Sequence, residues 1–364
     1  MPLRNPNGPV IILAGGTGGH IFPGLSVAKA LQQRGVEVTW LGAEGGMETR
    51  LVPRNDVALD TIPIKGLRGK GVVTLLTAPF KVLRAIAGAK SVLRSRRPRA
   101  VISFGGYAAG PGGFAARLSG VPLFVHEQNR AAGMTNRVLS RMADAVFTGF
   151  PDTFAGIDER WVGNPVRAEI TAIAAPSQRF ATRADQAALN VLVLGGSQGA
   201  LVLNESVPVA LRQLMDEGMT FNVRHQCGDR GVKVAQAQYQ TKGVDATVEP
   251  FIGDMAQAYA WADLVICRAG ALTLAEVCAA GVASVLVPFA AAVDDHQTKN
   301  ANYLVARHAA RMATQSSDLA DKIVAHVRDI KDRDTLLSMA EAARSLSKPN
   351  AATDVADIVL ESAA

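Results

Sequence analysis

The segment Val10-Ile-Ile-Leu-Ala-Gly-Gly-Thr-Gly-Gly-His20 carries the strongest structural signal in this chain of 364 residues. Its apolar run predicts a buried strand, its glycines predict a tight loop, and the residues up to about Arg34 predict a helix. The same order returns at Asn190-Val-Leu-Val-Leu-Gly-Gly-Ser-Gln-Gly-Ala200, with Gly195 lying 180 residues after Gly15. We therefore expect two domains that each open with a strand, a glycine loop and a helix.

Further short apolar runs, separated by helical stretches, follow each of these openings. Such runs are typical of parallel βαβ units. The predicted strands are 36–41, 100–104, 123–125 and 145–148 in the first half, and 221–225, 246–248, 264–266 and 284–287 in the second. The predicted fold class is α/β, with two Rossmann-like, doubly wound domains facing across a cleft. The proline in Gly163-Asn-Pro-Val-Arg167 interrupts regular structure, so we divide the chain into domains 1–165 and 166–346.

Composition and charge narrow the functional classes. The three cysteines, Cys227, Cys267 and Cys278, have no metal-like or redox spacing, which favours a reduced, cytosolic compartment. No apolar run approaches the length of a membrane span or a signal peptide. The first 165 residues hold 20 Lys and Arg against 10 Asp and Glu, whereas the remainder holds 18 against 22. A basic half next to an acidic half predicts contact with a polyanion, either nucleic acid or anionic lipid.

Three glycine loops, 15–20, 105–111 and 195–200, are candidate phosphate sites, although any single loop of this kind can be only a tight turn. Ile21 stands where a dinucleotide fingerprint needs its third glycine, and there is no Walker loop. Gly270 precedes a predicted helix in which Glu276 could bind ribose hydroxyls or could be an ordinary surface residue. Asp294-Asp-His-Gln297 could bind sugar hydroxyls or cap a helix.

Taken together, these motifs resemble one family. The set is Gly15–His20, Gly105-Gly-Tyr107, His126-Glu-Gln-Asn129, Gly163–Arg167, Gly195–Ala200, Arg268-Ala-Gly-Ala-Leu-Thr-Leu-Ala-Glu276 and Asp295-His-Gln297. It is similar, in order and over nearly the whole chain, to the MurG family of peptidoglycan N-acetylglucosaminyltransferases, which have the two-domain GT-B fold. The resemblance implies inverting transfer of N-acetylglucosamine from its UDP donor to lipid I at the cytoplasmic face of the inner membrane. It also implies that the last helix, about 347–364, crosses back to the first domain.

The resemblance implies roles for individual residues. The expected donor-binding residues are Thr17, Gly18, Gly19, Asn129, Arg167, Ser197, Ile252, Ala271, Leu272, Thr273, Leu274, Ala275, Glu276 and Gln297. The acceptor diphosphate is expected on Gly15, Gly16, Gly105, Gly106 and Tyr107. Neither a metal nor another cofactor is expected. Ala108 and Ala109 replace serines that many family members carry, which removes hydroxyl contacts at that loop.

Two residues are candidates for the base that deprotonates the acceptor hydroxyl. His20 is the first, because imidazole titrates near neutral pH, although it could instead donate to the acceptor's phosphate. Glu127 is the second, with the alternative that it orients neighbouring loops. The sequence leaves both roles open for His20 and for Glu127.

The basic, apolar stretch 65–99 is the predicted membrane contact. It holds ten Lys and Arg among apolar residues such as Phe80 and Leu83, which could otherwise form the buried face of a long helix. Nucleic-acid binding is not expected because no recognition motif accompanies the charge. Alternative functions are a UDP-N-acetylglucosamine 2-epimerase, another UDP-sugar enzyme of the same fold, or a non-catalytic membrane scaffold.

Overall fold

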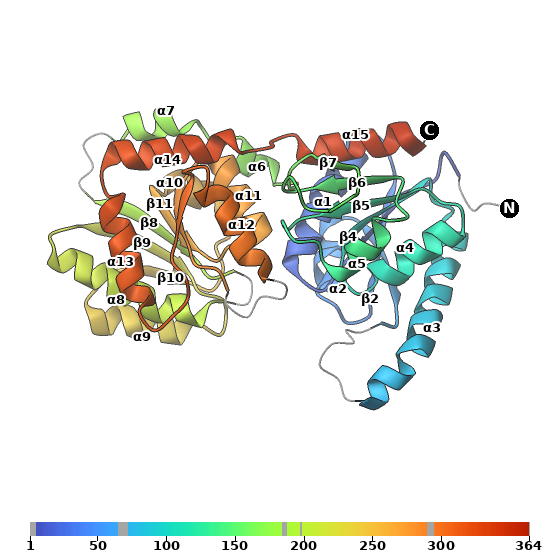
Figure 1. The fold of residues 1–364 in the computed structure, drawn as a ribbon, viewed down its shortest axis with the longest axis horizontal. Helices are drawn as coiled ribbons and strands as arrows, with labels where there is room; N and C mark the ends of the chain where they lie inside the picture. The colour runs from blue at the N-terminus through green and yellow to red at the C-terminus, as the bar shows by residue number, and fades with distance from the viewer. Residues whose placement is uncertain (1–4, 65–71, 184–187, 197–198, 290–294, 364) are drawn as a thin grey trace. The chain divides into compact units, whose positions relative to one another are not determined.

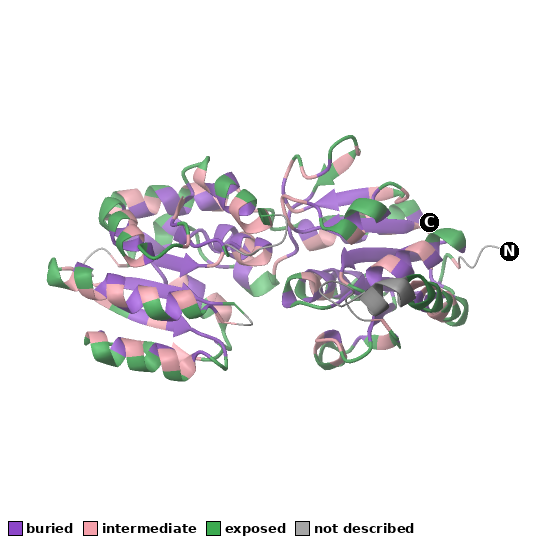
Figure 2. Cartoon of the chain, turned by 60° about the horizontal axis from the view of Figure 1, so that its bottom comes forward, coloured by how far each residue is buried: buried purple, intermediate pink, exposed green. Residues whose placement is uncertain are grey.

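The computed structural model describes residues 5–64, 72–183, 188–196, 199–289 and 295–363 (Figure 1). The chain forms two compact units, one of Met1–Val166 with Asn350–Ala364 and one of Arg167–Pro349. The described part of each unit is a parallel sheet with helices on both faces. In Figure 2 the strands are the most continuously buried elements of both units.

The first unit is built on a seven-stranded sheet in the order β3-β2-β1-β4-β5-β6-β7. Its strands are β1 (Val10–Ala14), β2 (Val38–Ala43), β3 (Ala58–Ile62), β4 (Ala100–Gly105), β5 (Leu123–Glu127), β6 (Ala145–Thr148) and β7 (Glu159–Trp161). Its helices are α1 (Gly18–Gln32), α2 (Glu48–Leu51), α3 (Val72–Arg96), α4 (Ala109–Leu118), α5 (Met134–Leu139), α15 (Ala351–Ala363) and the 3₁₀ turn η1 (Pro53–Asn55).

The C-terminal helix α15 belongs to this first unit. Its buried Val355 and Val359 join the same hydrophobic cluster as Val27 and Leu31 of α1. Arg34, two residues after the end of α1, also forms a bidentate ion pair with Asp357 of α15. Apolar packing along one face of α15 therefore fixes the helix against α1.

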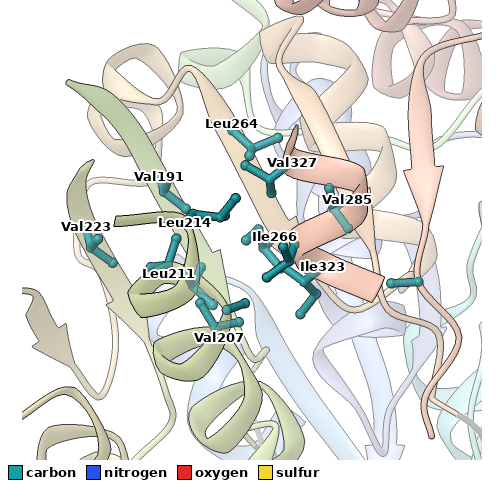
Figure 3. Close-up of a cluster of buried hydrophobic side chains, with 14 of the residues drawn as sticks. Val191, Val207, Leu211, Leu214, Val223, Leu264, Ile266, Val285, Ile323 and Val327 are labelled. Carbon is teal, nitrogen blue, oxygen red and sulfur yellow. The ribbon is translucent and has the colours of Figure 1, made fainter. Parts of the chain in front are cut away.

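The second unit has a six-stranded sheet in the order β10-β9-β8-β11-β12-β13. Its strands are β8 (Leu189–Leu194), β9 (Phe221–Gln226), β10 (Thr247–Glu249), β11 (Leu264–Cys267), β12 (Ala283–Leu286) and β13 (Ala310–Met312). Its helices are α6 (Ala168–Thr171), α7 (Pro176–Ala181), α8 (Leu201–Asp216), α9 (Val232–Lys242), α10 (Met255–Trp261), α11 (Ala271–Ala280), α12 (His296–Val305), α13 (Leu319–Asp329) and α14 (Arg333–Ser345). Figure 3 shows Val207 and Leu211 of α8 and Ile323 of α13 packed on strand residues Val191 and Ile266.

Three strands of the structure, β3, β7 and β13, are absent from the sequence prediction. All three lie at the edges of their sheets. Edge strands are covered on fewer sides and therefore lack a continuous apolar run, and β7 reads only Glu-Arg-Trp. The predicted second strand, 36–41, is also displaced, because the structure places β2 at Val38–Ala43.

Within the described residues, none of the helices combines the length and the apolar character that a membrane span requires.

Candidate functional site

The predicted site residues gather at corresponding places in the two sheets. In each sheet the strand order reverses once, between β1 and β4 in the first unit and between β8 and β11 in the second. Loops that follow the carboxyl ends of parallel strands diverge at such a reversal and leave room for a ligand. Residues 15–20 follow β1 and 105–107 follow β4, whereas 195–200 follow β8 and 268–276 follow β11.

The first glycine loop is shorter than the sequence suggested. Helix α1 begins at Gly18, so His20 lies in its first turn and not in the loop. The N–H groups of Gly18 and Gly19 precede the first bonds of the helix, in which His20 and Ile21 donate to the Thr17 carbonyl. This helix start is suited to an anionic ligand.

Glu48, a residue without a sequence signal, holds the beginning of this loop. Its fully buried carboxylate accepts the Gly16 N–H at 3.1 Å and the Ala43 N–H at 2.9 Å. The Gly16 N–H, predicted to bind the acceptor diphosphate, is therefore engaged within the protein. A Cβ on Gly15 would lie 2.2 Å from Glu48 Oε1, so this close packing requires glycine.

The loop after β4 packs directly on the first glycine loop. Gly106 has φ +99° and a Cβ there would lie 2.4 Å from the Gly15 carbonyl oxygen, so only glycine fits. The next residue, Tyr107, is 54% exposed. Helix α4 begins at Ala109, and both Ala108 and Ala109 are buried.

His20 stands where these two loops and the end of β5 meet. Its half-buried ring lies against Gly105, because a Cβ on that glycine would be 3.2 Å from His20 Cε1. Its Nδ1 lies 2.9 Å from Oε1 of Gln128, the residue that follows Glu127. Gln128 belongs to the quoted motif 126–129 but received no role from the sequence.

Glu127 has a different environment from His20. It is 2% exposed, and its carboxylate accepts the Asn129 N–H at 3.0 Å, the Asn129 amide at 3.2 Å, the Gly133 N–H at 3.1 Å and the Asn136 amide at 3.0 Å. A carboxylate with four internal donors organises the loop after β5. This geometry favours the loop-orienting alternative for Glu127 over the role of a base.

In the second unit, Glu276 is the centre of a buried cluster. Its Oε1 accepts from Arg167 at 2.8 Å and its Oε2 accepts from the Tyr259 hydroxyl at 3.1 Å. Burial raises the pKa of Glu276, and the Arg167 guanidinium opposes that rise. Burial and the neighbouring Glu276 raise the pKa of Tyr259, which is therefore a hydroxyl donor at neutral pH. Tyr259, from α10, is a further residue that the sequence did not reveal.

The other residues of the second unit that are predicted to bind the sugar donor lie in or after segments that follow the strands of its sheet. Ala271, Leu272, Thr273 and Leu274 form the first turn of α11, followed by Ala275. Ile252 is 8% exposed in the loop after β10, and Gln297 Oε1 accepts the Phe289 N–H at 2.9 Å. Ser197 lies outside the described residues.

A glutamine from β9 holds the start of the glycine loop that follows β8. Gln226 accepts the Gly196 N–H at 3.1 Å and donates back to the Gly196 carbonyl at 3.1 Å and to the Pro250 carbonyl at 2.9 Å. Gln226 thus accepts the N–H of a loop glycine, Gly196, as Glu48 accepts that of Gly16 in the first unit. Among the residues described, no three His, Cys, Asp or Glu side chains are grouped as a metal site would need.

Known proteins match both units. Residues 10–148 match the glycosyltransferase family 28 N-terminal domain, and residues 190–357 match the glycosyltransferase family 28 C-terminal domain. A Xanthomonas euvesicatoria protein is 63% identical over 356 residues, which are 98% of this chain and 81% of that protein. Its name is UDP-N-acetylglucosamine--N-acetylmuramyl-(pentapeptide) pyrophosphoryl-undecaprenol N-acetylglucosamine transferase.

Solved structures agree with this assignment. The crystal structure of Acinetobacter baumannii MurG is 44% identical, covers 97% of this chain and 99% of its own, and superposes with a TM-score of 0.84. UDP-GlcNAc 2-epimerase from Neisseria meningitidis covers 97% of this chain and all of its own, with a TM-score of 0.65, but is only 12% identical and so shares the fold alone. The chain has the α/β GT-B fold and belongs to glycosyltransferase family 28, within the MurG family of N-acetylglucosamine transferases.

Proposed function

We propose that this chain moves N-acetylglucosamine from UDP-N-acetylglucosamine to the muramyl sugar of lipid I, which yields lipid II. The observation that carries the proposal is the 63% identity, over 98% of the chain, to a relative named for that transfer. The site is consistent with it, because each unit presents a glycine loop and a helix start of the kind that binds a diphosphate. The epimerase alternative has support only from the shared fold.

The proposed reaction is a single displacement with inversion. The acceptor oxygen forms a bond to the anomeric carbon, the bond from that carbon to the UDP oxygen breaks, and its electron pair leaves with UDP. The acceptor's proton passes to His20 Nε2, since Nδ1 faces Gln128. We assign the base to His20 because the carboxylate of Glu127 is occupied by donors of its own loop.

Donor binding is assigned to the second unit. In the proposal, the ribose hydroxyls reach the Glu276 carboxylate beside Arg167, and the diphosphate meets the loop 195–200 and the first turn of α11. Backbone N–H groups and the helix dipole stabilise the departing diphosphate, so the mechanism requires no metal. The acceptor is assigned to the first unit, at the start of α1 and the loop 105–107.

The finer proposal for location is the cytoplasmic face of the inner membrane, reached through α3. Phe80 is 76% exposed and Leu83 is 63% exposed, so these two are not part of the helix's buried face. That face is instead formed by Ala85, Ala89 and Leu93, which repeat every four residues. Lys81 and Arg84 are exposed beside Phe80 and Leu83.

In the rest of the predicted membrane stretch, Arg94 and Arg97 are exposed, whereas other residues are outside the described part or bonded within the protein. Lys65, Arg68 and Lys70 lie outside the described residues, as do the side chains of Val72, Val73, Leu75 and Leu76. At the other end, Arg96 pairs with Asp60 and Arg99 donates to the Gly8 carbonyl. The proposed membrane contact therefore rests on residues 80–84.

The deciding experiment incubates the purified chain with radiolabelled UDP-N-acetylglucosamine, with and without a lipid I analogue, and with and without EDTA. We expect label to enter the lipid product only when the acceptor is present, at an unchanged rate in EDTA. Formation of UDP-N-acetylmannosamine without transfer would replace the proposal by the epimerase. Loss of transfer in EDTA would overturn the metal-free mechanism alone.

A further inference from the structure

Gln128 links two histidines of the first unit. The residue is 2% exposed at the end of β5, and its side-chain amide lies between the ring of His126 and the ring of His20. Each atom of this series that can only accept requires its neighbour to donate. The directions of the hydrogen bonds therefore follow in turn from the Gly163 carbonyl.

The series starts at the Gly163 carbonyl, which can only accept. His126 Nε2 lies 2.9 Å from that oxygen, so Nε2 carries a hydrogen. The ring is completely buried and its burial lowers the pKa of His126 to about 4, so the ring is neutral near pH 7. His126 Nδ1 therefore presents a lone pair.

The orientation of the Gln128 amide follows from this lone pair. Gln128 Nε2 lies 3.2 Å from His126 Nδ1 and 2.9 Å from the His126 carbonyl oxygen. Both partners are acceptors, so both amide hydrogens point to His126, and the reversed amide would place an oxygen against two acceptors. Gln128 Oε1 consequently faces His20 Nδ1, at 2.9 Å.

We propose that Gln128 is a positioning residue that holds His20 in the tautomer with the hydrogen on Nδ1 and the lone pair on Nε2. An amide oxygen can only accept, so His20 Nδ1 must donate. Contact with Gly105 supports the ring on the side of the glycine loop. The use of the Nε2 lone pair to take the acceptor's proton rests on the proposed function, whereas the tautomer itself does not.

The backbone of Gln128 is held as firmly as its side chain. The Asn164 amide donates to the Gln128 carbonyl at 3.0 Å, and His126 stacks on Phe104 with a centroid distance of 5.3 Å. The segment Gly163–Asn164 therefore holds both His126 and Gln128. A positioning role needs such support, because an amide that could rotate would not select one tautomer.

The tautomer is measured by NMR of the full chain labelled with ¹⁵N-histidine, at pH 8 and without substrate. The His20 signals are identified by their loss in His20→Asn. We expect a protonated-type shift for His20 Nδ1 and an unprotonated-type shift for Nε2. The opposite pattern in the wild-type protein would overturn the inference.

Gln128→Met then tests the cause, because it keeps the length of the side chain and removes both polar atoms. We expect His20 to leave the single Nδ1–H tautomer and kcat to fall about 10- to 100-fold, with both KM values changed less than about threefold. A folded Gln128→Met protein with the wild-type tautomer would overturn the inference. The matched control is Gln226→Met, which removes the glutamine that ties the glycine loop of the second unit and should leave the His20 signals unchanged.

The two proposals can fail separately. If no sugar transfer occurs but His20 shows the Nδ1–H tautomer, the proposed function is lost and the positioning role of Gln128 remains. If transfer occurs but the wild-type tautomer is Nε2–H, the positioning role is lost and the proposed function remains.

Discussion

Glu276 is a carboxylate that folding buries to 7% exposure, so its partners define what it can bind. Arg167 and Tyr259 occupy one position on each oxygen, and a carboxylate offers about four acceptor positions. The two unused positions can accept ribose hydroxyls without displacing either partner. Arg167, with 41% of its side chain exposed, opposes the rise in the pKa of Glu276 that burial causes.

The first prediction concerns this carboxylate. Glu276→Gln should lower kcat/KM for UDP-N-acetylglucosamine about 10- to 100-fold, since hydrogen bonds to a charged group contribute about 1.5–3 kcal/mol. The KM for the lipid acceptor should not change. Steady-state kinetics with each substrate varied in turn measures both values, and an unchanged donor kcat/KM would contradict ribose binding here.

Tyr259→Phe is a smaller change in the same cluster of side chains. It removes only the hydroxyl that donates to Glu276 Oε2 at 3.1 Å, within a fully buried ring. We expect a loss of about fivefold in the same donor parameter, which corresponds to about 1 kcal/mol for one hydrogen bond. A larger loss than that of Glu276→Gln would contradict the assignment of Glu276 as the ribose ligand.

At the scale of elements, α3 carries the proposed membrane contact. The double variant Phe80→Ser/Leu83→Ser should weaken binding to vesicles that contain anionic lipid by at least about tenfold, because each side chain loses about 1.5–3 kcal/mol of apolar burial. Co-sedimentation with the vesicles measures this. Activity on a water-soluble acceptor analogue should be retained.

Charge on the same helix is tested separately. Lys81→Ser/Arg84→Ser should weaken binding to anionic vesicles by about tenfold or more, at about 1 kcal/mol per cation, and hardly change binding to neutral vesicles. The matched control is Lys322→Ser/Arg328→Ser on α13 of the second unit. Equal losses in both double variants would mean that charge acts without regard to position.

Helix α7 is an element that the sequence does not predict. No element is predicted from the sequence for residues 172–188, yet α7 lies there and buries Arg179 and Phe180 within the second unit. The Arg179 guanidinium donates to the Ala280 and Gly281 carbonyls at the end of α11, and burial lowers its pKa to about 10. Arg179 binds carbonyl groups that lie 101 and 102 residues later in the chain, so no local sequence pattern reveals this contact.

Some parts of the site follow from local sequence patterns and others do not. The strand and glycine-loop openings are local patterns, so the α/β fold and the loops at 15, 105 and 195 could be read from the sequence. Glu48, Gln128, Gln226 and Tyr259 act through contacts between residues distant in sequence or through a hydrogen-bond direction. Periodicity contains no information about such contacts.

At the scale of the whole molecule, each unit contains a fully buried histidine, His126 in the first and His225 in the second. Burial lowers the pKa of each to about 4 from an ordinary value of 6.5. Because the folded pKa lies below the unfolded one, the unfolded chain binds more protons between these values. The stabilisation is therefore complete above pH 6.5 and is lost as the pH falls towards 4.

Both units should lose stability in acid, by about 2 kcal/mol per histidine between pH 7 and pH 5. Hydrogen exchange followed by mass spectrometry, corrected for its intrinsic pH dependence, measures this with peptides from 10–43 for the first unit and 189–226 for the second. His225→Phe should remove the acid sensitivity of the second unit only, since a phenyl ring can keep the edge contact with Tyr239. The exposed His308→Asn should change neither unit, because Asn tolerates the φ of +59° at that position. If the 189–226 peptides of His225→Phe were as acid-sensitive as those of the wild type, another group would have to account for the loss.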